Sequence, residues 1–122
     1  MAANTSPAPA AVSDLTTGRV LAGHIEHARG HWGRFRGLML RRDLAQGTGL
    51  WIEPCRSIHM MFMRFPIDAV FIDRTGTVTR VASNLRPWTG FAMGGRGAHA
   101  VIELPAGAAT GVLPGHRIEV SE

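Results

Sequence analysis

A chain of 122 residues, 45% of them hydrophobic, is long enough for one domain with one core and too short for several. Its formal charge of +4 is the balance of 13 basic residues, all Arg and scattered along the chain, against nine acidic residues. Without a basic block or a basic stripe interleaved with aromatics, a nucleic-acid partner is not expected. The single cysteine, Cys55, excludes an internal disulfide and a multi-cysteine zinc site.

The N-terminal residues 1–15 are rich in Ala, Pro, Ser and Thr and show no hydrophobic period, which predicts a disordered tail before a single domain over residues 16–122. A basic segment followed by an apolar one is absent from this tail, so a cytoplasmic protein is expected, with an exported form whose leader has been removed as the alternative. Residues 18–28 then predict one strand or two short ones.

Residues 30–44 change in character, because Trp32, Phe35 and Met39 follow one another at helical spacing. This segment predicts the only helix of the fold, a short one. A glycine-rich loop and a short strand over residues 50–53, ended by Pro54, are expected to follow.

The longest apolar run, IHMMFMRFPIDAVFID over residues 58–73, is too short and too often interrupted to span a bilayer. Pro66 lacks a backbone donor, so it is expected between two strands, residues 57–64 and Ile67–Ile72. Both faces of the second strand are apolar, which is typical of a strand covered on both sides. Alternation would place His59, Met61 and Met63 on one face of the first strand.

The segment Asp-Arg-Thr-Gly at residues 73–76 predicts a turn, with residues 77–82 returning as the hairpin partner. Residues 84–97 contain four glycines and predict a loop. Its apolar side chains Trp88, Phe91 and Met93 are expected to cap the end of the fold, and the alternative is a lid or a surface for a protein partner.

The C-terminal part predicts strands over residues 98–104 and 117–120, with one helical turn at residues 106–111. About seven short strands, one short helix and Gly/Pro turns indicate a mainly β single domain, either a β-sandwich or a partly open barrel.

Several blocks of the chain resemble the domain-of-unknown-function 192 family over about residues 20–120. The blocks are Arg-Gly-Leu-Met at 36–39, Phe-Met-Arg at 62–64, Pro-Ile-Asp-Ala-Val-Phe-Ile-Asp-Arg-Thr-Gly at 66–76, Val-Ile-Glu-Leu at 101–104 with Ala-Gly at 106–107, and Gly115. The resemblance implies a small mainly β domain whose short helix carries the first block, and it implies no established activity. His116 stands where members of that family often have an aspartate.

Candidate site residues are the charged side chains set within apolar blocks, above all Arg36, Arg64 and Asp68. An unpaired charge that is buried loses its hydration, which costs several kcal/mol. One of these arginines is therefore expected to pair with Asp68. The pair is either a structural ion pair or part of a polar pocket for a small anion or sugar hydroxyls. His59 and Glu103 are expected to join the ligand-binding set.

Three kinds of function follow from these residues. The favoured one is a non-enzymatic small-ligand-binding or accessory module, without cofactor or metal, whose ligand is a small anion or a carbohydrate. The alternatives are a hydrolase-type enzyme using Asp68 with His59 or His99, and a purely structural partner subunit. A copper(I) site at His59, Met61 and Met63 is a minor alternative, with a methionine-filled core as the simpler interpretation.

Overall fold

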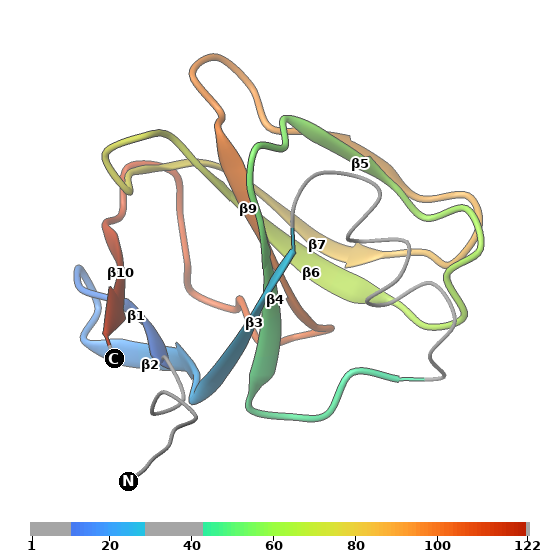
Figure 1. Ribbon diagram of the computed structural model, residues 1–122, viewed down its shortest axis with the longest axis horizontal. Helices are drawn as coiled ribbons and strands as arrows, with labels where there is room; N and C mark the ends of the chain where they lie inside the picture. The colour runs from blue at the N-terminus through green and yellow to red at the C-terminus, as the bar shows by residue number, and fades with distance from the viewer. Residues whose placement is uncertain (1–10, 29–42, 122) are drawn as a thin grey trace, which may run out of the picture.

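The computed structural model describes residues 11–28 and 43–121, and every regular element in these two segments is a β-strand (Figure 1). The strands are β1 (Ala11–Asp14), β2 (Arg19–Ala22), β3 (His24–Ala28), β4 (Thr48–Ile52), β5 (Ser57–His59), β6 (Ile67–Ile72), β7 (Val78–Leu85), β8 (Phe91–Met93), β9 (Ala100–Pro105) and β10 (Ile118–Ser121).

The strands form a five-stranded sheet of order β3-β4-β9-β6-β7, a three-stranded sheet of order β10-β1-β2 and a two-stranded sheet of β5 and β8. Pairing is antiparallel except between β3 and β4, which run parallel. Every residue of β6 and β9 is buried, because these two strands lie side by side inside the five-stranded sheet. This confirms the strand predicted over Ile67–Ile72 and the covering of both its faces.

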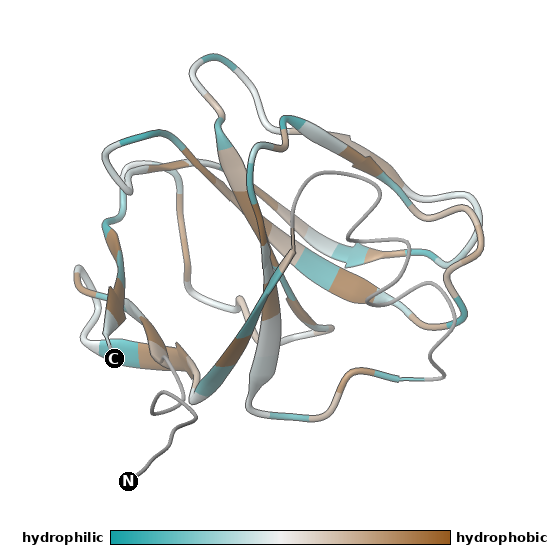
Figure 2. Ribbon diagram, in the orientation of Figure 1, coloured by the Kyte–Doolittle hydropathy of each residue, from teal (hydrophilic) through white to brown (hydrophobic). Residues whose placement is uncertain are grey.

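The two faces of the large sheet belong to two hydrophobic clusters. On one face, Phe71 and Ala69 pack with Ile58 and Met60, which come from β5 and the residue after it. On the other face lie side chains of the large sheet and of the three-stranded sheet, among them Val70, Ile72, Ile102, Val12, Leu21 and Ile118. Figure 2 shows the apolar residues running along these strands. Among the described residues no sheet closes into a barrel, so the predicted mainly β single domain is confirmed in its sandwich-like form.

The predicted hairpin is confirmed and is longer than expected. β6 pairs antiparallel with β7, and Gly76 takes a φ of 90° in the turn between them. The Asp73 side chain closes this turn by accepting hydrogen bonds from the backbone amides of Thr75 and Thr77 at 2.8 and 3.0 Å. An aspartate that bonds its own turn in this way fixes the reversal locally.

Other element boundaries differ from the prediction. Residues assigned to the N-terminal tail form β1, which pairs with β10 and β2, because Val12 is fully buried between them. The segment 18–28 resolves into two short strands, β2 and β3. Residues 106–111 form turns rather than a helical turn. The predicted helix lies almost wholly outside the described residues.

The strand predicted over residues 57–64 ends at His59. The Met60 carbonyl accepts hydrogen bonds from the amides of Met63 and Trp88, which turns the chain, and Phe62 takes a positive φ of 67°. Met61 is consequently exposed while Met63 is buried, so the common face predicted for them with His59 is wrong, and the copper alternative loses its geometry.

The predicted glycine loop over residues 84–97 contains a strand that the sequence did not predict, β8, paired with β5. Its apolar side chains do not cap the fold: Trp88 is 55% exposed, and Phe91 and Met93 are exposed to a similar degree. The capping prediction is therefore wrong.

Candidate functional site

Asp68 lies on β6 with only 1% of its surface exposed, and backbone amides surround its carboxylate. Oδ1 accepts a hydrogen bond from the Asn84 amide at 2.8 Å, and Oδ2 accepts from the amides of Gly107 and Ala109, each at 2.9 Å. These donors belong to the end of β7 and to the turn after β9. A buried carboxylate with such donors ties loops to the sheet and needs no cationic side chain.

The predicted pairing of Arg64 with Asp68 is therefore wrong. Arg64 is exposed, and the ion pairs between described residues join His99 to Glu53 and His116 to Asp14. The sequence argument required a partner for a buried charge, which is correct, but the partners are peptide N–H groups. Arg36 lies outside the described residues.

The other predicted members of the site do not share a face with Asp68. Ala69 is the register partner of Glu103, so Glu103 projects to the face of Ala69 and Phe71, whereas Asp68 projects to the opposite face with Val70. His59 lies on β5, which covers the face of Phe71. A site that combines Asp68 with His59 or Glu103 would have to cross the sheet.

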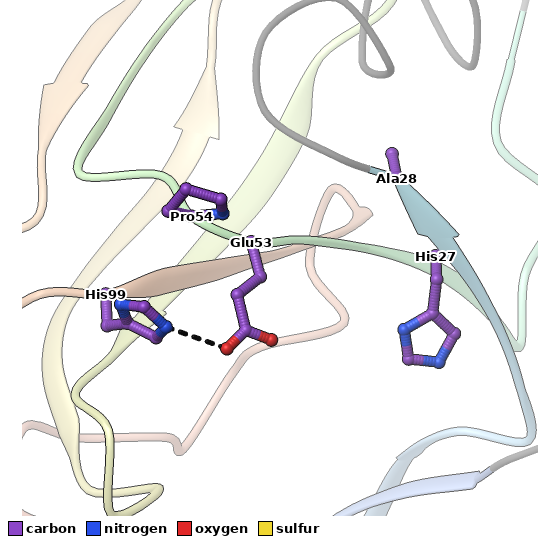
Figure 3. A pocket seen from close by; sticks show the side chains of 5 residues that line it. All are labelled: His27, Ala28, Glu53, Pro54 and His99. Atoms are coloured by element: carbon purple, nitrogen blue, oxygen red, sulfur yellow. Dashed lines mark hydrogen bonds and ion pairs between the residues drawn. The ribbon is translucent and has the colours of Figure 1, made fainter.

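A different polar cluster lies where β4 ends and β9 begins. Glu53 follows β4, and its Oε2 lies 2.8 Å from Nε2 of His99, the residue before β9 (Figure 3). Its Oε1 accepts a hydrogen bond from the Trp51 indole N–H at 3.1 Å. Since an ionised carboxylate only accepts, the His99 ring nitrogen is the donor. The Glu53 side chain is 47% exposed and that of His99 is 21% exposed, so both remain within reach of a solute.

Strand register explains why these residues meet. His27 on β3 is the parallel partner of Trp51 on β4, and their ring centroids lie 6.2 Å apart. Side chains two positions apart on a strand project to the same side, which carries Glu53 to the side of Trp51. β9 then brings His99 alongside β4 because Trp51 pairs with Ile102.

Three depressions adjoin the cluster, and His99 lines all of them. The largest, of about 550 Å³, is lined by His27, Ala28, Glu53, Pro54 and His99 (Figure 3). The second, of about 370 Å³, extends past Trp51 to the turn at residues 73–76 and has Ile72, Ala100 and Val120 among its apolar lining residues. The third, of about 310 Å³, adds Arg56. We call the three depressions together the His99 groove; their volumes are of the size that small ligands occupy.

The turn that borders the groove keeps a negative charge there. The Thr75 hydroxyl donates to Asp73 Oδ1 at 2.7 Å, and this hydrogen bond, against a smaller opposing effect of burial, lowers the pKa of Asp73 below its ordinary value of 3.8. Three amide donors from the turn, those of Thr75, Gly76 and Thr77, also lower the pKa of Asp73. Asp73 is thus ionised beside His99 and Arg74 at neutral pH.

Sequence reasoning identified His99 as a possible site residue but missed Glu53 and did not connect Trp51 or His27 with His99. The available signal was the alternation Trp51–Glu53 at the end of a strand that Pro54 terminates. The pairing of that strand with both β3 and β9, which assembles the groove, is not visible in local sequence.

A sandwich-like β domain with a small polar groove at the strand ends is the class of protein that this geometry defines. None of the described segments forms a helix that could cross a membrane. The chain belongs to the DUF192 family, described as "Uncharacterized ACR", whose model matches residues 13–120. The resemblance predicted from the sequence is thereby confirmed.

Relatives carry no assigned activity that transfers to this chain. A "UPF0127 protein" of Thermococcus sibiricus is 36% identical over 97 residues, which cover 75% of this chain and 61% of that protein. A protein of unknown function from Novosphingobium aromaticivorans has a solved structure with a TM-score of 0.76 at 25% identity, covering 91% of this chain and 83% of that one. A second solved structure, a "putative transcription regulator" from Sinorhizobium meliloti, gives a TM-score of 0.73 at 28% identity, with 91% of each chain covered.

Proposed function

We propose that this protein is a non-enzymatic module that binds a small hydroxylated molecule, of the sugar or polyol class, in the His99 groove. The observation that carries the proposal is the Glu53 carboxylate, held by Trp51 on one oxygen and by His99 on the other while about half its surface stays exposed. Each oxygen has a further lone pair, so the carboxylate can accept hydroxyl hydrogen bonds without losing its own support.

The charge of the groove does not select for an anion. Glu53 and Asp73 place two carboxylates on its lining, and Arg56 and Arg74 place two cations there, so an anion meets no excess of positive charge. His27 and Trp51 add ring surface, and Ile72 and Ala100 add apolar surface, on which the C–H faces of a sugar ring can rest. Pockets that combine apolar walls with a few oriented polar groups are typical of small-molecule sites.

The hydrolase alternative and the original Asp68-centred cleft receive less support. The Asp68 oxygens already accept three amide hydrogen bonds, and a general acid or base must reach the proton it transfers. The third alternative, a purely structural partner subunit, gives no role to the exposed Glu53 carboxylate that Trp51 and His99 hold in place.

The test is a thermal-shift screen of neutral monosaccharides, disaccharides and polyols, with inorganic phosphate as the anionic comparison. A ligand present at ten times its Kd stabilises the fold by about 1.4 kcal/mol, which corresponds to roughly 4–6 °C for a domain of this size. Hits are then measured by ligand-observed saturation-transfer NMR.

Glu53→Gln and His99→Ala should each abolish the shift of a hit while leaving the unliganded Tm nearly unchanged, because both side chains reach solvent. Asp43→Asn, at another exposed carboxylate, is the matched control and should retain binding. Shifts that survive in both groove variants, or a response to phosphate alone, would contradict the proposal.

A further inference from the structure

Five large apolar side chains stand exposed at one end of the molecule. Each is between 49% and 61% exposed, and we call them the aromatic tip: Met61, Phe62, Trp88, Phe91 and Met93. They come from the β5–β6 turn, the β7–β8 turn and β8. Monomeric proteins seldom gather this many large apolar groups on one surface without a use for them.

Backbone contacts hold the two turns side by side. The Trp88 amide donates to the Met60 carbonyl at 2.8 Å, and the rings of Phe62 and Trp88 meet edge to face with centroids 5.4 Å apart. β5 pairs with β8, so Phe91 and Met93 continue the same region. Figure 1 shows the two turns together at the end of the molecule farthest from the chain termini.

Phe62 and Trp88 adopt an unusual backbone conformation. Their φ angles are 67° and 68°, in the left-handed region that bulky residues rarely adopt. Glycine or asparagine would suit both positions better. The tertiary hydrogen bonds of Met60 fix the turns, and the result is that both rings face solvent rather than the core.

The charged residues next to the tip in the sequence are cationic. Arg64 follows Phe62 by two residues and Arg86 precedes Trp88 by two, and both side chains are exposed. No Asp or Glu occurs in residues 54–67 or 74–102, and the two aspartates Asp68 and Asp73 lie between these ranges. The segments that carry the tip thus combine exposed apolar side chains with exposed arginines and contain no carboxylate.

We propose that the aromatic tip docks this domain onto the surface of an anionic phospholipid bilayer. Trp, Phe and Met side chains would enter the interfacial layer, where amphipathic aromatic rings are favoured, while the arginines would contact lipid phosphates. Charge complementarity with an anionic surface carries the argument. The bilayer is favoured over an acidic protein because three of the five apolar groups, Met61, Phe62 and Trp88, stand on turns, and none of the five lines the three depressions of the His99 groove.

The experiment measures co-sedimentation of the full chain with vesicles of phosphatidylcholine alone and of phosphatidylcholine containing about 30% phosphatidylglycerol. Binding is expected to the anionic vesicles at low salt and to weaken as salt is raised. The double variant Trp88→Ser/Phe91→Ser should bind at least roughly 10-fold more weakly, because two buried rings are lost from the interface. Leu113→Ser, at an apolar residue 59% exposed outside the tip, is the matched control and should bind as the unmodified chain does.

Removal of one tip arginine, in Arg64→Gln or Arg86→Gln, should weaken anionic binding by about fivefold, whereas Arg117→Gln, at an exposed arginine before β10, should have little effect. Circular dichroism establishes that each variant is folded. The proposal is overturned by equal binding to both vesicle types, by no binding to either, or by an equal loss in Leu113→Ser. It is also overturned if sedimentation velocity shows that the tip instead joins two copies of the chain.

Discussion

Asp68 provides the sharpest test of how this fold is held together. In Asp68→Asn the side chain keeps one acceptor oxygen and gains an NH₂ group, so at least one backbone amide of Asn84, Gly107 or Ala109 must face another donor. A hydrogen bond to a charged acceptor contributes about 1.5–3 kcal/mol, and an unsatisfied buried donor adds a cost of similar size. We therefore expect Asp68→Asn to lower the free energy of unfolding by about 2–4 kcal/mol.

The assay is urea unfolding followed by tryptophan fluorescence, with linear extrapolation to water. Asp43→Asn removes an exposed carboxylate and should change the free energy of unfolding by less than about 0.5 kcal/mol. Native-state hydrogen exchange gives a second readout, because the amides of Gly107 and Ala109 should lose protection in the variant if Asp68 is their acceptor. A loss of less than about 1 kcal/mol with both amides still protected would refute the reasoning.

Two further predictions concern packing and pH. In Gly94→Ala the new methyl carbon would lie 2.5 Å from the buried ring of Phe71, so a loss of about 1–3 kcal/mol is expected in urea unfolding, while Gly23→Ala, with open space around it, should be nearly neutral. Asp14 is fully buried, and burial raises its pKa, but hydrogen bonds from His116 and two backbone amides outweigh burial and leave the pKa below 3.8. A lowered carboxyl pKa stabilises the fold above pH 3.8 and ceases to do so as the pH falls through the folded-state value. The stability advantage over Asp14→Asn should therefore be full at pH 6 and shrink below about pH 4; an advantage independent of pH would contradict it.

The strands that could be predicted are those whose first and last residues are determined by neighbouring residues in the sequence. β6 begins after Pro66, contains only residues suited to burial on both faces, and ends at a turn that Asp73 and Gly76 build by themselves. Its limits in the structure are those expected from the sequence. β5 was predicted too long because the signal that ends it is tertiary: the Met60 carbonyl bonds to Trp88, which lies in a different segment. Apolar periodicity continues through that turn and gives no sign of it.

The candidate site was less predictable than the fold because it depends on register. The sequence located a buried carboxylate at Asp68, but two of its three partners, Gly107 and Ala109, lie 39 and 41 residues away, and all three are backbone amides that carry no residue signature. Likewise, Glu53 and His99 are 46 residues apart and meet only because β4 pairs with β9. Composition identifies which side chains can do chemistry, whereas sheet pairing decides which of them share a face.

Asp68 and Glu53 differ in the groups that donate hydrogen bonds to their carboxylates. This difference separates a structural residue from a candidate binding residue. Asp68 accepts only from backbone amides and is sealed from solvent, so its hydrogen-bonding capacity is used in joining loops to the sheet. Glu53 accepts from two side chains, Trp51 and His99, and remains half exposed, so capacity for a solute is left over. Donors on side chains can shift when a ligand arrives, but the amides of a packed turn cannot shift without loss of the fold. For this reason substitution at Asp68 should change stability first, and substitution at Glu53 should change binding first.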